Sequence, residues 1–255
     1  MHIPEPIPTD IRDETFAGVT YHIRGQLVPE LQIELSHEPV MFEHHVMLWK
    51  EPGVQIELRK LPGGIKRKIA GLDFFVTRAI GPGRIAFSRD SPGQVIPMHI
   101  PHGQELNVRE HQFIAATDAV DYSFERVQGV RNMLLGGSGF FIDKFRAGSG
   151  DAIVWVHGHG NVFEVTLEQG EQIDVEAGGW LYKDTSVKME AVGMGLKTGL
   201  LGGGGKLTWN RFTGPGRLAI QTMFMAPLEG IESGQGGAAV EGGAIGAVLG
   251  GLLRG

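Results

Sequence analysis

The sequence predicts a mainly β protein made of three pseudo-symmetric repeats, each about 66 residues long, within one closed sandwich- or barrel-like domain. The first observation behind this prediction is a pair of glycines, separated by one residue, that occurs three times. The pairs are Gly81/Gly83, Gly148/Gly150 and Gly214/Gly216. The spacing from each pair to the next is nearly constant, and a fixed period of this kind is typical of a fold assembled from similar units.

The second observation is a set of short segments in which apolar and polar residues alternate. Examples are residues 31–35, 54–58, 105–108 and 172–175. Alternation with a period of two is typical of strands that bury one face. The third observation is that no amphipathic helical pattern of ten residues occurs before residue 230. Many short strands without helices favour a sandwich or a barrel.

Each repeat is expected to contain the same series of strands and turns. In the first, residues 74–80 and 84–88 are strands joined at the glycine pair, and a turn at 89–93 leads into strand 94–100. In the second, strands 140–146 and 152–156 are followed by a turn at 157–161 and strand 162–167. The six paired glycines are interpreted as turn or structural glycines, because such positions favour residues without a Cβ atom.

The units are expected at about residues 71–127, 139–192 and 205–226. The third unit is short, and residues 16–60 complete it, since 32–49 align with 98–115 at an offset of 66. A ring closed in this way by its two ends would hide sheet edges that otherwise promote aggregation. The predicted organisation is a loose arm at 1–15, one domain at 16–228, and a glycine-rich tail at 229–255.

The tail has glycines at four-residue steps, at Gly242, Gly246 and Gly250. On a short C-terminal helix they would form one smooth face suited to close packing.

The chain has no cysteine, which excludes disulfides and thiolate chemistry and fits a reducing compartment. A net charge of -6 argues against nucleic acid as a partner. With neither a signal peptide nor an apolar span in view, we expect a cytoplasmic protein, with peripheral membrane contact as an option.

Several of these segments resemble the AIM24 family, also described as a bacterial and archaeal domain of unknown function. The resemblance rests on residues 64–68, 74–75 and 81–83, on 139–141, and on 202–205 with 211–216, and it extends over about residues 16–226. It implies a fold like that of the tryptophan RNA-binding attenuation protein (TRAP-like), with oligomerisation, and in the mitochondrial branch a role in organising the inner membrane. It implies no reaction and no catalytic residue. Ser149 departs from the family pattern, where proline is usual.

One pattern resembles a metal site. His157 and His159 with Glu164 match part of the cupin motif, in which two histidines and a glutamate hold a divalent transition metal. The repeat places residues 157–161 at a hairpin turn, whereas a cupin site needs both histidines on a strand that faces a barrel interior. The structural interpretation is therefore favoured, and no cofactor is expected.

The basic cluster Lys66, Arg67 and Lys68 is interpreted as a solvated loop or as a contact with an anionic membrane surface. Taken together, the sequence favours a non-enzymatic, self-associating scaffold that forms homo-oligomers and binds a protein partner of unknown identity. Two alternatives stay open. One is a cupin-like metal-dependent enzyme that uses His157, His159 and Glu164, and the other is a small-ligand or RNA binder by analogy of fold.

Overall fold

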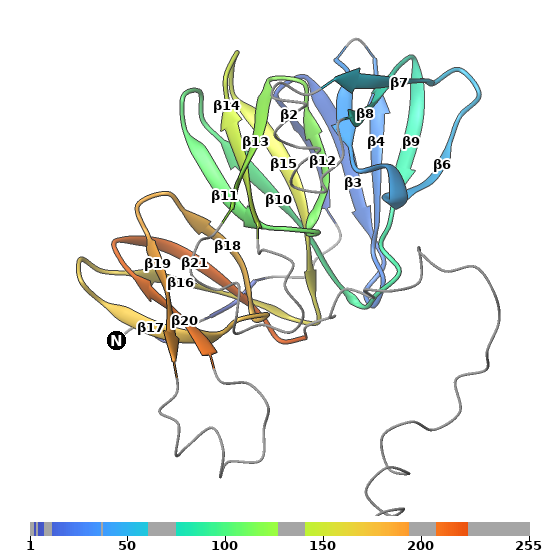
Figure 1. Ribbon diagram of the computed structural model, residues 1–255. Coiled ribbons are helices and arrows are strands. Elements are labelled where there is room, and N and C mark those ends of the chain that lie inside the picture. Colours follow the sequence, from blue (N-terminus) through green and yellow to red (C-terminus); the bar gives the residue numbers. More distant parts are fainter. Residues whose placement is uncertain are drawn as a thin grey trace, which may run out of the picture. The chain divides into compact units, whose positions relative to one another are not determined.

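A computed structural model describes residues 3, 5–7, 12–36, 38–60, 75–126, 141–193 and 208–223. These residues form a mainly β protein, with antiparallel strands and one 3-10 turn, η1 (His44–Val46) (Figure 1). No helix among them is long and apolar enough to cross a membrane. The basic cluster at 66–68 and the glycine-rich tail at 229–255 lie outside the described residues, so the predictions made for them stay predictions.

The described strands form four sheets. The seven-stranded sheet has the order β1 (Glu5–Pro6), β16 (Val162–Leu167), β21 (Gly216–Gln221), β18 (Trp180–Asp184), β11 (Glu105–Arg109), β14 (Phe141–Ala147), β13 (Val120–Arg126). The six-stranded sheet has the order β10 (Gly93–Ile100), β15 (Ala152–His159), β12 (Phe113–Thr117), β5 (Val40–Phe42), β8 (Phe75–Ile80), β7 (Gln55–Lys60). The five-stranded sheet has the order β2 (Arg12–Phe16), β3 (Val19–Arg24), β4 (Glu30–Leu35), β9 (Gly83–Phe87), β6 (Met47–Lys50). The three-stranded sheet has the order β17 (Gln172–Glu176), β20 (Thr208–Thr213), β19 (Lys188–Gly193).

Strand partners recur along the chain at the spacing of the glycine pairs. The pairs Val40–Ala79, Leu106–Phe145 and Ile173–Phe212 join β5 to β8, β11 to β14, and β17 to β20. The third strand of each group follows the same spacing, with Ile56, Tyr122 and Met189 opposite the second member of each pair. The strand register, which sets which side chains reach the core, is therefore the same in three places.

A second group of three strands recurs in the same way, namely β4–β9–β6, β10–β15–β12 and β16–β21–β18. The last strand of each group has a register shift at an equivalent place, after Met47, Phe113 and Trp180. A register shift of this kind bends a strand and re-aims its side chains. The last strand of each group therefore departs from regular pairing at the same position.

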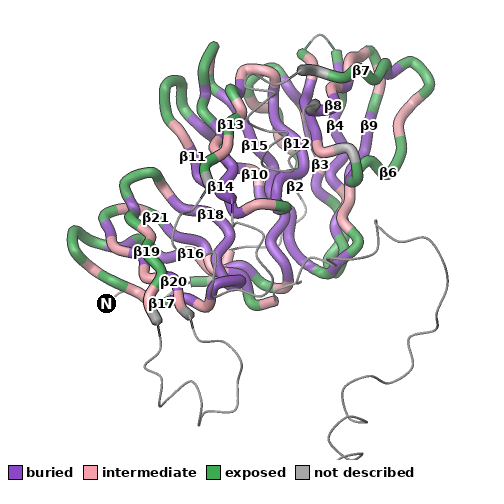
Figure 2. The backbone as a smooth tube through the Cα atoms, viewed as in Figure 1, coloured by how far each residue is buried: buried purple, intermediate pink, exposed green. Residues whose placement is uncertain are grey.

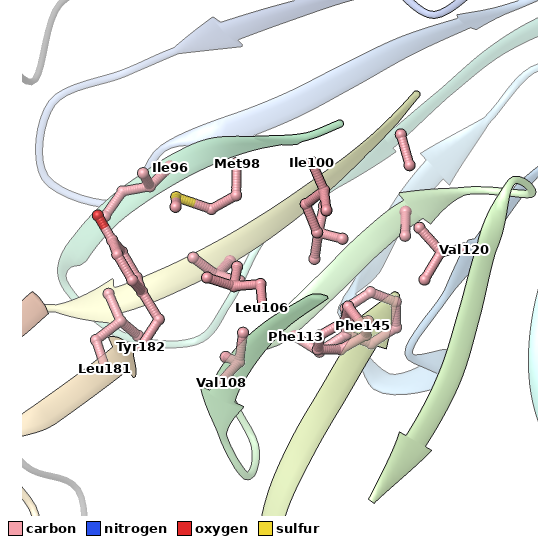
Figure 3. Close-up of a cluster of buried hydrophobic side chains, with 14 of the residues drawn as sticks. Ile96, Met98, Ile100, Leu106, Val108, Phe113, Val120, Phe145, Leu181 and Tyr182 are labelled. Carbon is pink, nitrogen blue, oxygen red and sulfur yellow. The ribbon is translucent and has the colours of Figure 1, made fainter. Parts of the chain in front are cut away.

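The buried apolar side chains fall into three clusters. The first contains Ile96, Met98, Ile100, Leu106, Val108, Phe113 and Phe145, all buried, and Figure 3 shows them facing one another across strands. Leu181 and Tyr182 of β18 belong to this same cluster. The second cluster includes Tyr21, Phe42 and Phe87, and the third includes Trp180 and Phe212.

Two joins link these groups through hydrogen-bonded strands. At the first join β12 pairs with β5, and at the second β18 pairs with β11. The equivalent third join would pair β6 with β17, but among the described residues β6 ends one sheet and β17 ends another. The predicted closed barrel is therefore not found in the described part of the chain. The reason is that strand partners fill two of the three equivalent joins and leave the third open.

The described part of the N-terminal arm differs from the loose segment that the sequence predicts. Residues of β1 pair with Glu164 and Phe163 of β16, and β2 pairs with β3 over its whole length. Gln94 adds a hydrogen bond from its Nε2 atom to the carbonyl oxygen of Ile7, at 3.0 Å. A proline-containing strand can occupy this place because β1 is an edge strand and its outer side needs no donor.

The paired glycines lie where neighbouring backbone is very close. A Cβ atom at Gly81 would be 2.4 Å from the carbonyl oxygen of Leu35, and one at Gly214 would be 2.3 Å from that of Glu168. Gly83 and Gly216 have positive φ, at 137° and 134°, which favours glycine. Four of the six glycines thus have a local reason for lacking a side chain.

The middle pair is less constrained. A Cβ atom at Gly148 would be 2.1 Å from Oδ2 of the Asp121 side chain, and one at Gly150 would meet nothing within 4 Å. This is also the pair in which Ser149 stands where the other two have proline. We therefore expect alanine to be tolerated better at Gly148 and Gly150 than at the glycines of the other two pairs.

Candidate functional site

Two regions of the described chain are candidates for a functional site. The first is the buried pair His157 and His159, and the second is the exposed edge of β6. They differ in kind, because the first is closed to solvent and the second is open to it.

Both histidines lie on β15, a central strand of the six-stranded sheet. The sequence predicts a turn at 157–161, but β15 continues to His159, and the reversal falls at Gly160, where φ is 69°. His157 pairs with Val95 of β10, and its amide donates to the carbonyl of Gln112 at 2.8 Å. The strand extends because its neighbours continue alongside it, and every residue of β15 is buried.

The two rings are in contact, with centroids 5.0 Å apart in an edge-to-face arrangement. His159 Nδ1 lies 2.9 Å from the hydroxyl of Ser91. Neither ring nitrogen of His157 makes a hydrogen bond of ordinary geometry within the described residues, although the backbone of Ser91 is close enough to favour its protonated form. An imidazole without partners is costly to bury in either form, and much more costly when charged.

One glycine makes room for the ring of His157, and a second makes room for Val162. A Cβ atom at Gly93 would be 2.6 Å from the Cε1 atom of the His157 ring, and one at Gly158 would be 2.2 Å from a methyl group of Val162. Gly93 and Gly158, which resemble turn glycines in the sequence, thus reflect close packing between β10, β15 and β16, whereas Gly160 with its positive φ lies at the turn.

Burial is the main cause of the low basicity of both histidines. It lowers the pKa of His157 to about 3, and neighbouring His159 and the Arg89 guanidinium lower it further. Burial also lowers the pKa of His159 to about 4, with Arg89 and Arg109 acting in the same direction. Both side chains are therefore neutral at pH 7.

Glu164, the third residue of the predicted metal set, has a different partner. The Tyr182 hydroxyl donates to Glu164 Oε2 at 2.5 Å. Burial is the main cause that raises the pKa of Tyr182, and the Glu164 carboxylate raises it further. Among the described residues, no three His, Asp or Glu side chains are arranged to hold a metal ion. Two guanidinium groups beside the histidines would also repel a cation. The donor set does not fit a divalent metal.

Arg89 is a residue of this region that sequence reasoning missed. The sequence places it in a turn, whereas its Nη2 atom donates to Glu43 Oε2 at 2.9 Å and to the carbonyl of Phe113 at 2.5 Å. Burial lowers the pKa of Arg89, and the Glu43 carboxylate opposes that change. No sequence signal marks the residue, since its partner lies 46 positions away.

The second region is the edge strand β6. Met47, Leu48 and Trp49 are 42%, 58% and 37% exposed, and Figure 2 shows exposed residues along this strand. Two more exposed apolar side chains, Ile56 and Leu58, lie on β7, the end strand of the six-stranded sheet. Large apolar groups concentrated on edge strands are typical of association surfaces.

A recess of about 360 Å³ lies beside β6. Its lining includes Met47 and Leu48 of β6, Val28, and the segment from Ser88 to Pro92. The recess is open to solvent and combines apolar and polar groups. It makes the apolar surface of β6 concave on one side, a shape that suits an inserted side chain better than a flat lipid surface.

The chain is similar to one described protein family and to a solved structure. The family model described as "Mitochondrial biogenesis AIM24" matches residues 21–223. A crystal structure of a protein from Streptococcus pyogenes, determined by a structural genomics consortium, has 20% sequence identity and a TM-score of 0.63. That likeness covers 81% of this chain and 94% of the other, and it concerns the fold. No curated protein matches the chain.

Proposed function

This chain belongs to the AIM24 family, and we propose that this member is a non-enzymatic scaffold that associates with itself through the open edge of β6. The observation that carries the proposal is the exposure of Met47, Leu48 and Trp49 on a strand that has no partner on one side within the described ranges. The family description refers to mitochondrial biogenesis and names no reaction, and the two histidines are buried away from any substrate in solvent.

The proposal includes a view of the architecture as three structural repeats related by pseudo-threefold symmetry. The strand registers, which recur at the spacing of the glycine pairs, support it. In such an array the internal joins are made by strand pairing, and each end keeps an unpaired edge. Exposed edges of this kind are usually short, charged or covered, because they recruit further strands. β6 is short, but three of its four residues are large and apolar.

Self-association is favoured over an enzymatic role by the location of the exposed apolar groups. Exposing large side chains has a cost, roughly 25 cal/mol per Å² of apolar surface left in water. Among the described residues this cost falls on β6 and β7, together with Ile3, Leu27 and Val28. A scaffold recovers it on assembly, whereas a monomeric enzyme gains nothing from it.

We expect Leu48→Lys to lower the average mass of the protein toward that of one chain, 27.6 kDa. A lysine on an edge strand stays hydrated and opposes pairing with a second strand. The comparison variant is Leu58→Lys, at another exposed apolar site, on β7, and a smaller fall in mass for it would assign the main contact to β6. The measurement is light scattering after size exclusion, between 1 and 100 µM protein. A wild-type mass equal to one chain at every concentration would contradict the proposal.

A further inference from the structure

We infer that β6 of one copy pairs with β17 of a second copy, in an antiparallel register in which Trp49 lies opposite Val175 and Lys50 lies opposite Asp174. The inference rests on the proposed self-association and names its two surfaces. It follows from three observations, which concern the burial of equivalent residues, the register of the two filled joins, and the charges at the open one.

The first observation is that β6 has the composition of a buried strand. Its equivalents in the repeating pattern are β12 and β18, which occupy the interior of their sheets. Leu48 is 58% exposed, whereas Ile114 and Leu181 at the equivalent positions are each 0% exposed. The same contrast holds for Met47, which is exposed, against Phe113 and Trp180, which are buried.

The cause of the contrast is the missing neighbour. β12 lies between β15 and β5, and β18 lies between β21 and β11, but β6 has only β9 beside it in the described part of the chain. The free side of β6 is the side on which the other two hold a strand. By the spacing of the repeating pattern, the strand expected on that side is β17. Its equivalents β5 and β11 pair with β12 and β18 at the filled joins, and β17 has the corresponding side unpaired among the described residues.

The second observation is the register that the two filled joins share. At the first, Ala115 lies opposite Phe42, and at the second, Tyr182 lies opposite Val108. Trp49 is the equivalent of Ala115, at a step of 66, and Val175 is the equivalent of Val108, at a step of 67. Transferring the register therefore places Trp49 opposite Val175, and the next pair is Lys50 opposite Asp174.

The third observation is charge complementarity at the open join. The filled joins have Ala116 opposite Met41 and Lys183 opposite Asn107 at this position. The open join would have a lysine opposite an aspartate, and opposite charges directly across two strands stabilise the pair. Asp174 is exposed and ion-paired with Arg211 at 2.7 Å, so its carboxylate lies at the surface of β17.

The position of Lys50 is compatible with a strand at its side. Its Nζ atom donates to the carbonyl oxygen of Val54 at 2.9 Å. Lys183, the equivalent lysine at a filled join, makes the same hydrogen bond to the carbonyl oxygen of Val187 at 2.7 Å. Because Lys183 has this arrangement with β11 beside it, Lys50 needs no rearrangement to accept β17.

We take a second copy as the partner because the two strands of the open join, β6 and β17, end different sheets of one chain. β6 ends the five-stranded sheet and β17 ends the three-stranded sheet, and no pairing joins them among the described residues. Contact of one copy's β6 with the next copy's β17 is head-to-tail. Such contacts leave one free edge of each kind, so assembly continues until a ring closes or a filament grows.

The register can be tested by cross-linking, since the chain has no cysteine of its own. Lys50→Cys protein is mixed with Asp174→Cys protein that carries a mass tag, and disulfides are formed under mild oxidation. We expect a heterodimer as the main product, because directly opposed residues bring their Cβ atoms within disulfide range. The matched control replaces Asp174→Cys by Glu190→Cys, an exposed acidic site on β19, at the other edge of the same sheet. That mixture should give at least tenfold less heterodimer.

The outcomes separate this inference from the proposal on which it rests. Homodimers of Lys50→Cys as the main product would overturn it in favour of β6 pairing with β6, while self-association would stand. An oligomeric mass without the heterodimer would also overturn it. A monomeric mass for the wild type and both variants would overturn the inference and the proposed function together. Thermal melts of the single variants show whether each is folded.

Discussion

Lowering the pH from 7 to 4 is expected to reduce the free energy of unfolding by about 3 kcal/mol through His157 alone. Burial lowers the pKa of this residue from its ordinary value of 6.5 to about 3 in the folded protein. Above pH 6.5 both the folded and the unfolded chain hold it neutral. Below pH 6.5 the unfolded chain binds a proton that the folded chain does not take up until the pH is near 3. Stability through this residue is therefore lost between pH 6.5 and pH 3.

The test compares urea unfolding of the wild type and His157→Phe at pH 7, 6, 5 and 4. The variant keeps a ring of similar size and removes the two buried nitrogens, so its loss of stability on acidification should be smaller by about 3 kcal/mol at pH 4. The same substitution at the exposed residue His102 is the control for the change of residue type. Equal profiles for wild type and His157→Phe would show that this histidine is not held neutral by burial. His159 acts in the same direction and remains in both proteins.

Gly81→Ala is expected to destabilise the fold by about 3 kcal/mol, the upper part of the range for overpacking. Its added Cβ atom would lie 2.4 Å from the carbonyl oxygen of Leu35, which is backbone and cannot rotate away. The same reasoning applies to Gly214→Ala, where the nearest atom is the carbonyl oxygen of Glu168, at 2.3 Å. The measurement is the free energy of unfolding from urea titration at pH 7.

The middle hairpin supplies graded controls for that experiment. Gly150→Ala meets nothing within 4 Å, so we expect a change of less than about 0.5 kcal/mol. Gly148→Ala meets the side chain of Asp121, which can turn aside, and should fall between the two. A loss at Gly150 as large as at Gly81 would contradict the account, because the cost would then come from glycine's flexibility and not from the close approach.

The β-rich fold was predictable from sequence because its signals are local. Alternation of apolar and polar residues depends on which face of a strand is buried. Two of the three glycine pairs mark places where backbones nearly touch. The closed ring was not predictable in the same way. Closure depends on whether β6 pairs with β17. The sequence of β6 does not predict this, since β6 is as apolar as its buried equivalents β12 and β18.

The buried histidines show the opposite difficulty. His157, Gly158 and His159, with Gly160 after them, look like a turn because glycine and polar residues dominate the segment. In the structure only Gly160 has the positive φ of a turn, and Gly158 is needed because Val162 packs against it. Tertiary packing thus outweighs local propensity here, because the strands on either side of β15, namely β10 and β12, belong to an earlier part of the chain.

The most direct test of the open-edge account is hydrogen–deuterium exchange of the wild-type protein at two concentrations, 1 and 100 µM. If copies associate through β6 and β17, amides in the peptides that contain 47–50 and 172–176 should both gain protection at the higher concentration, since pairing gives their free backbone groups partners. The interior strands β12 and β18 should exchange equally slowly at both. Protection that does not change in either edge strand while the mass rises would contradict the account, because the copies would then meet elsewhere.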